Sequence, residues 1–364
     1  MSTVFYAAIV LGILIFVHEL GHFAVAKWSG VVVEKFSIGF GPALLSRRKG
    51  ETEYCIAAVP FGGYVKMLGE DSLEDIPPEF HDRTFLSQPL YKRFLIVAAG
   101  PLMNLLLAIL LFFIVFALAG VTRLMPEVGE IQPGSPAEAA GLKKGDLIVR
   151  INETPVSSWE ELADSISKWK PGNEPLKIVV LRSGEYLEFR VTPTFREIKN
   201  LFGEPVTRPV IGITASGKVE LKKVGILKAA IQSIVQTIVV CKLFFVTVVK
   251  LIQRIIPFET LGGPILIAQM AGQQAQEGFF PFIAFMALIS VNLAVINLLP
   301  FPALDGGHLL LFTIEAITGR RFHQKALEWI QKIGLAFLII LMIAVFYNDL
   351  VRIFPSLPDL VRNR

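Results

Sequence analysis

Long apolar runs limit the folds that are open to this chain of 364 residues. Residues 4–17, 94–120, 279–299 and 329–347 carry almost no charged side chains, and 53% of all residues are hydrophobic. A helix of about 20 apolar residues crosses a bilayer, and soluble proteins rarely contain several such runs. The sequence therefore predicts a polytopic α-helical protein embedded in a lipid bilayer.

A metal-binding motif stands at the end of the first apolar run, where His18, Glu19 and His22 form the pattern His-Glu-x-x-His. Two histidines four residues apart lie on one face of a helix and can bind one metal ion, with the glutamate beside a metal-bound water. Ionisable groups at membrane depth are costly, so their presence there indicates function. The alternative is a solvated patch at a helix end.

A catalytic zinc site needs a third protein ligand, which this motif does not contain. The third apolar run ends in Asn297-Leu-Leu-Pro-Phe-Pro-Ala-Leu-Asp305. Its two prolines interrupt the helix, and membrane depth tolerates the exposed backbone groups only inside protein or beside water. A carboxylate at that point is a suitable zinc ligand, so Asp305 is the predicted third ligand.

Basic residues set the predicted topology. Lysines and arginines are frequent in residues 27–49 and 320–325, and the positive-inside rule places such connections in the cytoplasm. The N-terminus lacks the features of a cleaved signal peptide, so the first run is expected to stay attached with residue 1 outside.

Residues 224–256 are long enough to cross the membrane but carry Lys242 near the centre, where a lysine is costly. His22 and Asp305 must reach the same side of the membrane, which requires the third apolar run to point inward. We therefore expect residues 224–256 to form an amphipathic helix in the interface. Four transmembrane helices remain, and both termini are extracytoplasmic.

The loop at residues 28–93 contains an extended segment, residues 53–67, that alternates in hydrophobicity. A strand beside an active site can pair with an extended peptide, so Tyr54, Ile56 and Ala58 are expected to bind substrate. An ordinary cytoplasmic hairpin fits the pattern equally well.

Residues 126–215 have the composition of a globular domain. Strands are predicted at 147–151, 176–182 and 186–191 and a helix at 159–169. The run Ser135-Pro-Ala-x-x-Ala-Gly-Leu-x-x-Gly-Asp146 resembles a PDZ domain in the permuted bacterial order. In that family the segment around Ile211 and Gly212 resembles the loop that binds a C-terminal carboxylate, although an ordinary edge strand fits this short pattern too.

Taken together, these motifs resemble the site-2 proteases of the bacterial RseP type. The resemblance rests on the histidine motif, Gly-Phe-Gly at 39–41, Gly-Pro-x-x-Asn at 100–104, the PDZ-like region, and Asn-x-x-Pro-x-Pro-x-Leu-Asp-Gly at 297–306. It implies Zn²⁺ bound by His18, His22 and Asp305. It also implies that Glu19 is the general base and Asn297 positions substrate. RseP itself has two PDZ domains, whereas one is found here.

The resemblance further implies a bacterial inner-membrane enzyme that hydrolyses peptide bonds within transmembrane segments, such as those of anti-sigma factors or remnant signal peptides. Residues 53–67 would be a membrane-reentrant β-element, and the extracytoplasmic PDZ domain would recruit or filter substrates, with a C-terminal peptide as a ligand. The expected segments are 1–27, 28–93, 94–120, 121–218, 219–278, 279–304, 305–328, 329–347 and 348–364.

Three other classes of function were weighed against this one. A zinc peptidase for soluble or prenylated chains would take a glutamate from a separate helix as its third ligand. A PDZ scaffold or transporter with a structural metal would not need Glu19 between the histidines. Nucleic-acid binding is not indicated, because the net charge is only +4 and the basic residues flank membrane segments. Cys55 and Cys241 form no metal or disulfide pattern.

Overall fold

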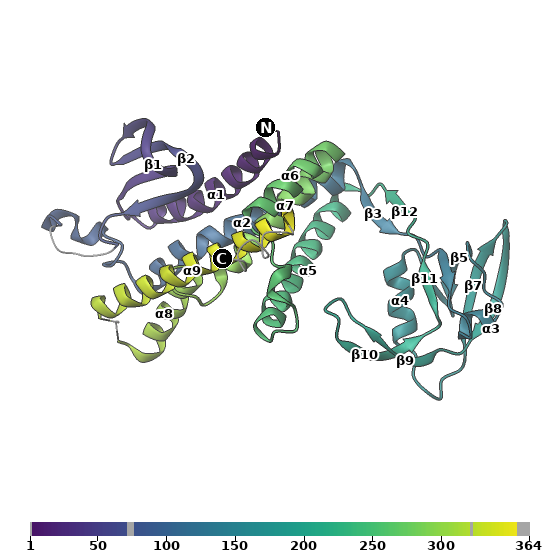
Figure 1. Ribbon diagram of the computed structural model, residues 1–364. Helices are drawn as coiled ribbons and strands as arrows, with labels where there is room; N and C mark the ends of the chain where they lie inside the picture. The colour runs from purple at the N-terminus through teal and green to yellow at the C-terminus, as the bar shows by residue number, and fades with distance from the viewer. Residues whose placement is uncertain (1, 71–75, 321–322, 355–364) are drawn as a thin grey trace. The chain divides into compact units, whose positions relative to one another are not determined.

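The computed structural model describes residues 2–70, 76–320 and 323–354 (Figure 1). The chain divides into two compact units. The helical unit draws on residues up to 115, 230–251 and 257 onward, and the inserted unit comprises residues 116–229 and 252–256. Each unit is described by itself below.

In the described part of the chain, five helices are long and apolar enough to cross a membrane. They are α1 (Ser2–Trp28), α2 (Leu90–Leu118), α5 (Ile226–Ile252), α7 (Phe279–Leu298) and α9 (Gln324–Ile353). The fold therefore agrees with the prediction of a multi-pass helical membrane protein. Several of these helices are longer than the apolar runs, because the apolar run reflects contact with lipid whereas the backbone hydrogen bonds of a helix continue into polar flanks.

Two shorter helices were not expected from the sequence. Helix α6 (Pro264–Glu277) lies within the region assigned to the amphipathic helix, and α8 (Asp305–Thr318) lies within the predicted last cytoplasmic loop. Each has 14 residues and so is about 21 Å long, too short to span a bilayer. The described part of this unit also contains two short 3-10 helices, η1 (Pro78–Arg83) and η2 (Phe258–Thr260).

Helices α1 and α2 approach each other closely where both carry glycine. A Cβ atom on Gly21 would lie 2.4 Å from the Ala99 carbonyl oxygen, and one on Gly100 would lie 2.3 Å from Nε2 of His22. Small residues allow such approach between membrane helices. The close packing predicted from the glycine and proline at 100–101 is therefore present.

Helices α1 and α7 run parallel. Near their starts the rings of Tyr6 and Phe282 are 5.5 Å apart, and near the end of α7 the Asn297 amide lies 3.4 Å from the His18 ring. The end of α7 therefore lies beside the C-terminal half of α1, which brings the segment after α7 to the histidine motif.

A β-hairpin follows α1 and packs against it (Figure 1). Its strands β1 (Val33–Lys49) and β2 (Thr52–Met67) pair antiparallel with an irregular register, in which Ser37 is paired with both Tyr64 and Cys55. The hairpin thus folds back on itself into a wider sheet. The sequence indicated the second strand but not the first, whose bend at Gly39 has φ +91°. A Cβ there would lie 2.6 Å from the Val59 carbonyl oxygen.

The inserted unit is built on an antiparallel sheet with strand order β6-β5-β7-β8. The strands are β5 (Leu147–Ile151), β6 (Thr154–Pro155), β7 (Leu176–Arg182) and β8 (Glu185–Val191). Helix α4 (Trp159–Ser167) packs Leu162 into the same core as Ile148 and Ile178. The three predicted strands and the helix are present, with ends that differ by one or two residues.

Three two-stranded ladders complete this unit: β3 (Val121–Leu124) with β12 (Val219–Lys222), β4 (Val128–Ile131) with β11 (Ile213–Ala215), and β9 (Thr194–Lys199) with β10 (Pro205–Val210). A short helix, α3 (Pro136–Ala139), is capped by the Ser135 side chain, which accepts a hydrogen bond from the Glu138 N–H. Ile211 is buried in the core, next to the turn at Gly212.

Candidate metal centre

Three side chains from α1 and α8, those of His18, His22 and Asp305, converge beside the C-terminal half of α1. The Nε2 atoms of His18 and His22 are 3.3 Å apart. Oδ2 of Asp305 lies 3.1 Å from Nε2 of His18 and 3.6 Å from Nε2 of His22. Within the residues that the structure describes, this is the group of His, Cys, Asp and Glu side chains whose ligand atoms gather closely enough to hold a metal ion.

The backbone between α7 and α8 places Asp305 at this point. Ala303 has φ +73°, and Gly306 and Gly307 are buried. A Cβ atom on Gly306 would lie 2.1 Å from the Leu299 carbonyl oxygen, and one on Gly307 would lie 2.4 Å from the carbonyl oxygen of Phe301. Glycine is required at both positions because no side chain fits between the start of α8 and the preceding turn.

Partners on α2 orient the two imidazoles. Nδ1 of His22 lies 2.9 Å from the Ile96 carbonyl oxygen, which can only accept, so Nδ1 carries the proton and donates it. Nε2 of His22 is then an unprotonated donor atom for a metal. Asn104 lies fully buried with its amide 3.3 Å from Nδ1 of His18. The sequence singled out Asn104 in a motif but did not predict this contact.

The cluster fits a zinc ion. Among the described residues, Oδ2 of Asp305 is buried and takes part in no hydrogen bond, so a bound metal ion would give it the partner that it lacks. Two imidazole nitrogens and one carboxylate oxygen form the type of ligand set that catalytic zinc sites use. A buried polar atom without a partner would otherwise be costly.

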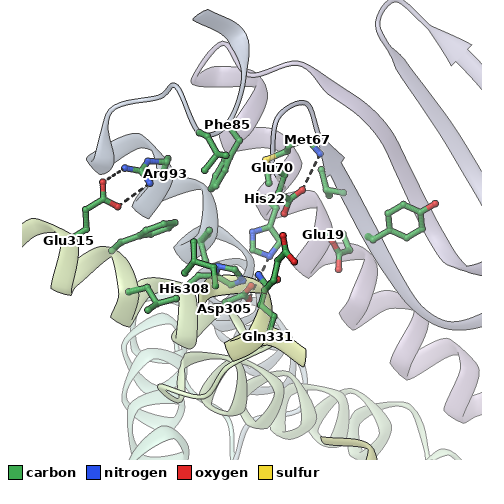
Figure 2. Close-up of a pocket in the computed structure, with 18 of the residues that line it drawn as sticks. Glu19, His22, Met67, Glu70, Phe85, Arg93, Asp305, His308, Glu315 and Gln331 are labelled. Atoms are coloured by element: carbon green, nitrogen blue, oxygen red, sulfur yellow. Dashed lines mark hydrogen bonds and ion pairs between the residues drawn. The ribbon is translucent and has the colours of Figure 1, made fainter. Parts of the chain in front are cut away.

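The cluster opens into a cavity of about 770 Å³, which Figure 2 shows from one side. Glu19 lines the cavity next to His22, with its carboxylate against the backbone N–H of Val65 in β2. Two residues further along β2, the backbone N–H of Met67 donates a hydrogen bond to Oε2 of Glu70, at a distance of 3.3 Å. Strand β2 thus forms one wall of the cavity and presents backbone groups to it.

A buried ion pair lies on another wall of the cavity (Figure 2). Arg93 donates to both carboxylate oxygens of Glu315, at 2.6 and 3.2 Å, and its guanidinium stands 5.1 Å from the ring centre of Phe312. This pair ties α2 to α8, the helix that begins at Asp305. Sequence reasoning missed it, since a single charge at each position gives no indication that the two helices meet.

The other predicted substrate-binding residues lie in different surroundings. Tyr54 is paired with both Phe36 and Arg47, and Ile56 with both Ile38 and Leu45, so the strand around them is paired on both sides. Ala58 follows in the same strand. Residues 63–67, by contrast, each have one partner residue in β1, and three of them, Tyr64, Val65 and Met67, line the cavity.

Comparison with known proteins identifies the family of this chain. A family model described as peptidase family M50 matches residues 6–341. A zinc metalloprotease named RasP from Oceanobacillus iheyensis is 31% identical, covering 97% of this chain and 100% of its own length. A candidate zinc metalloprotease of Campylobacter jejuni is 38% identical, covering 95% of this chain and 92% of its own. A similar protein of Clostridium acetobutylicum is 36% identical over 95% of this chain and 96% of its own.

These matches define the class as membrane-embedded zinc metalloproteases. The chain belongs to peptidase family M50, the site-2 protease family. It is a zinc-dependent protease, as its resemblance to the RseP type implied, and Zn²⁺ is its cofactor.

Proposed function

We propose that this enzyme hydrolyses peptide bonds within transmembrane segments of other membrane proteins. The observation that carries the proposal is the convergence of His18, His22 and Asp305 beside Glu19 in the C-terminal half of an apolar helix. A site on a membrane-spanning helix is poorly accessible to soluble peptides, whereas the transmembrane helix of another protein can lie beside it.

In this proposal, His18, His22 and Asp305 hold the zinc ion. A bound zinc ion would supply Lewis-acid chemistry for peptide hydrolysis. Glu19 would act as the general base towards the attacking water and as the general acid towards the leaving amine. The Asn297 amide, close to His18, positions the reacting carbonyl. Ile96 and Asn104 keep the two imidazoles in the orientation that the ligands need.

The substrate is proposed to bind as an extended strand along residues 63–67. A transmembrane helix uses its carbonyl groups in internal hydrogen bonds, so it must unwind before cleavage. Pairing with a free strand edge replaces those hydrogen bonds. The proximity of the Val65 N–H to Glu19 supports this edge as the site, rather than the doubly paired strand around Ile56.

We also propose that the protein lies in the bacterial inner membrane with four transmembrane helices and both termini outside. The parallel course of α1 and α7 supports an odd number of crossings between them. Helix α2 is one crossing. If α5 also crossed, α6 would have to cross back before α7, but α6 has only 14 residues and is too short to span a bilayer. We therefore place α5 in the interface. The amphipathic distribution of charges on α5, with Lys242 near its centre, supports an interfacial helix.

Labelling with an impermeant thiol reagent tests this topology. A single cysteine at the exposed Thr260, in a Cys55→Ser, Cys241→Ser background, is expected to react from outside the cell. Reaction only from the cytoplasm would mean that α5 crosses, and the proposed topology would be wrong.

We propose further that the inserted unit is an extracytoplasmic PDZ domain that recruits or gates substrates. Its sheet, helix α4, and the segment at Ile211 and Gly212 beside that helix support this assignment.

Proteolysis by the purified full-length protein tests the central proposal. The protein is assayed for bound zinc and incubated in detergent with a single-span substrate that carries helix-weakening residues, and the products are sequenced by mass spectrometry. A cut inside the span that is lost on chelation and restored by zinc is expected. Cleavage confined to regions outside the span would contradict the proposal.

A further inference from the structure

One face of helix α8 lines the cavity along most of the helix. Asp305, His308, Phe312 and Glu315 all border the cavity, and their spacing of three or four residues places them on one side of the helix. The metal-cluster residue Asp305 stands at one end of this face, and the ion pair of Glu315 with Arg93 stands at the other. A substrate that binds at the cluster and extends along this wall therefore meets His308 next.

His308 is an imidazole without a partner in the described part of the chain. It is half-buried, and among the described residues neither of its ring nitrogens forms a hydrogen bond or an ion pair. A histidine that only fills a core usually pairs its ring nitrogens, because a buried polar atom without a partner is costly. The ring N–H of His308 is thus open to a ligand in the cavity.

His308 stands beside the metal cluster but is not part of it (Figure 2). It follows Asp305 by three residues, and side chains with this spacing on a helix have Cβ atoms about 5–6 Å apart. Within the described chain, the ligand atoms that gather within 4.8 Å of one another belong to His18, His22 and Asp305, without His308. The imidazole can therefore contact a substrate held at the cluster without competing for the metal.

The ring of His308 is held by a stack of side chains on the same wall. Its centre lies 6.4 Å from the ring centre of Phe312, which in turn lies 5.1 Å from the guanidinium of Arg93. Arg93 is fixed by two hydrogen bonds to Glu315. A donor that stabilises charge in a transition state must be held in place before the reaction begins. The ion pair and the phenyl ring supply this support.

Glu19 and His308 reach the cavity from different helices. Glu19 is on α1 with its carboxylate against β2, whereas His308 is on α8. Among the described residues the two side chains form no hydrogen bond or ion pair with each other, so each is available to a different atom of a substrate. In peptide hydrolysis a base acts on the attacking water while negative charge develops on the carbonyl oxygen. Glu19 serves the water, and the oxygen gains from a donor of its own.

We propose that His308 is a further catalytic residue, whose ring N–H donates a hydrogen bond to the carbonyl oxygen of the peptide bond under attack. The ring keeps its proton throughout, so it stabilises the developing charge and takes no part in proton transfer. The inference deepens the proposed function and rests on the site assigned there. It holds for any peptide bond that reaches the cluster, inside or outside a transmembrane segment.

Steady-state kinetics of the purified full-length protein in detergent tests the inference on the bond that the parent cuts in a single-span substrate. His308→Phe keeps a ring against Phe312 but has no N–H, so kcat should fall about 10²-fold while KM changes less than about threefold. His308→Leu is a second variant without a donor. His308→Asn and His308→Gln carry an amide N–H near the reach of Nδ1 and Nε2, so one of the two should keep at least about five times the kcat of His308→Phe.

Binding of a tetrahedral mimic gives a readout without turnover. A fluorescein-labelled phosphonamidate peptide with apolar side chains resembles the attacked carbonyl group in shape and charge, and its anisotropy gives Kd. His308→Phe and His308→Leu should each weaken its binding about tenfold or more. The matching amide peptide, measured in a Glu19→Gln background, should bind within about threefold with and without either change, because the ground-state carbonyl carries little charge.

Zinc content and thermal unfolding of each variant identify losses that are due to missing metal or misfolding. His81→Phe is the matched control, because His81 is an exposed histidine outside the cavity, and it should match the parent within about twofold. Unchanged phosphonamidate affinity in the variants without a donor, or equal losses of kcat in all four variants of His308, would overturn the inference. So would loss of zinc from folded His308→Phe, since His308 would then be a ligand. A parent that cuts only outside the span contradicts the proposed function but leaves these comparisons valid.

Discussion

The helical unit and the inserted unit differ in what surrounds their polar side chains. In the helical unit His18 and His22 are 8% and 9% exposed, and each imidazole has a fixed partner on α2. In the inserted unit Arg196 and Arg208 are exposed, and among the described residues they have no acidic partner. At membrane depth a polar group without a partner is costly, whereas water satisfies an exposed guanidinium.

This difference matches the proposed division of labour, in which the helical unit carries the chemistry and the inserted unit recognises substrates. A catalytic group must stay in one orientation, so the helical unit surrounds its cluster with glycines that admit close packing and with an ion pair between α2 and α8. A recognition surface must remain open to a ligand. Variants of the first unit should therefore change metal content or rate, and variants of the second should change binding or local stability.

The largest effect is expected for Asp305→Ala. It removes the carboxylate from the cluster, so both bound zinc and proteolysis should be lost, as they should for His22→Ala. Metal analysis of the purified protein and a cleavage assay measure the two quantities. Asp82→Ala, at an exposed aspartate outside the cavity, is the control. Full zinc occupancy in Asp305→Ala would mean that another residue is the third ligand.

Glu19→Gln should separate rate from metal content. It removes the proposed base but no ligand, so proteolysis should fall about 10²–10⁴-fold while zinc stays bound. The same substitution at the exposed Glu79 should leave both unchanged. Activity of Glu19→Gln close to that of the parent would exclude Glu19 as the base.

Val65→Pro should weaken proteolysis by about tenfold, because proline cannot donate the strand N–H that faces the cavity. Proline is tolerated at an edge strand when the lost N–H points away from the sheet, so the fold and the zinc content should persist. Val65→Ala keeps the N–H and is the control. Equal turnover of both variants would rule out substrate pairing along residues 63–67.

In the inserted unit, Arg182→Ala should reduce stability without changing the metal site. Asp146 is fully buried, and Arg182 donates to both of its oxygens at 2.6 and 2.7 Å. Loss of the arginine leaves a buried charge, at a cost of about 2 kcal/mol, less than for a fully buried pair because Arg182 is partly exposed. Hydrogen exchange across residues 116–229 measures the effect, with Arg190→Ala as the control. Unchanged protection would show that Asp146 is stabilised by other groups.

The smallest effect is a pH dependence at Glu161. Hydrogen bonds from the backbone N–H and hydroxyl of Ser157 lower the pKa of this carboxyl. Because the pKa is lower in the folded than in the unfolded state, the stabilisation is present above the unfolded pKa, about 4.3, and is lost as the pH falls through the folded pKa. Glu161→Gln should flatten the acid side of the local stability curve. An identical acid response in the variant would remove Glu161 as its source.

The sequence was sufficient to predict the long apolar helices and to nominate His18, His22 and Asp305 as ligands. The length and apolarity of the runs were enough to indicate membrane helices, because every segment that spans a bilayer must be long, apolar and internally hydrogen-bonded. Spacing alone placed His18 and His22 on one helix face, because the helical period is fixed. The strands of the inserted unit were likewise predicted from their alternation and turn residues.

The tertiary structure decided which distant groups meet. Asp305 was nominated by chemistry, but its distance of 3.1 Å to His18 depends on the parallel course of α1 and α7 and on the tight backbone at Gly306 and Gly307. Because β1 bends back on itself, Ile56 pairs with β1 on both sides and lies inside the sheet. Residues 63–67 pair on one side only and form an open edge. The pairing of Arg196 with Arg208 depends on hairpin register. Local patterns fix local geometry, whereas packing between segments far apart in the chain depends on shape that no local pattern contains.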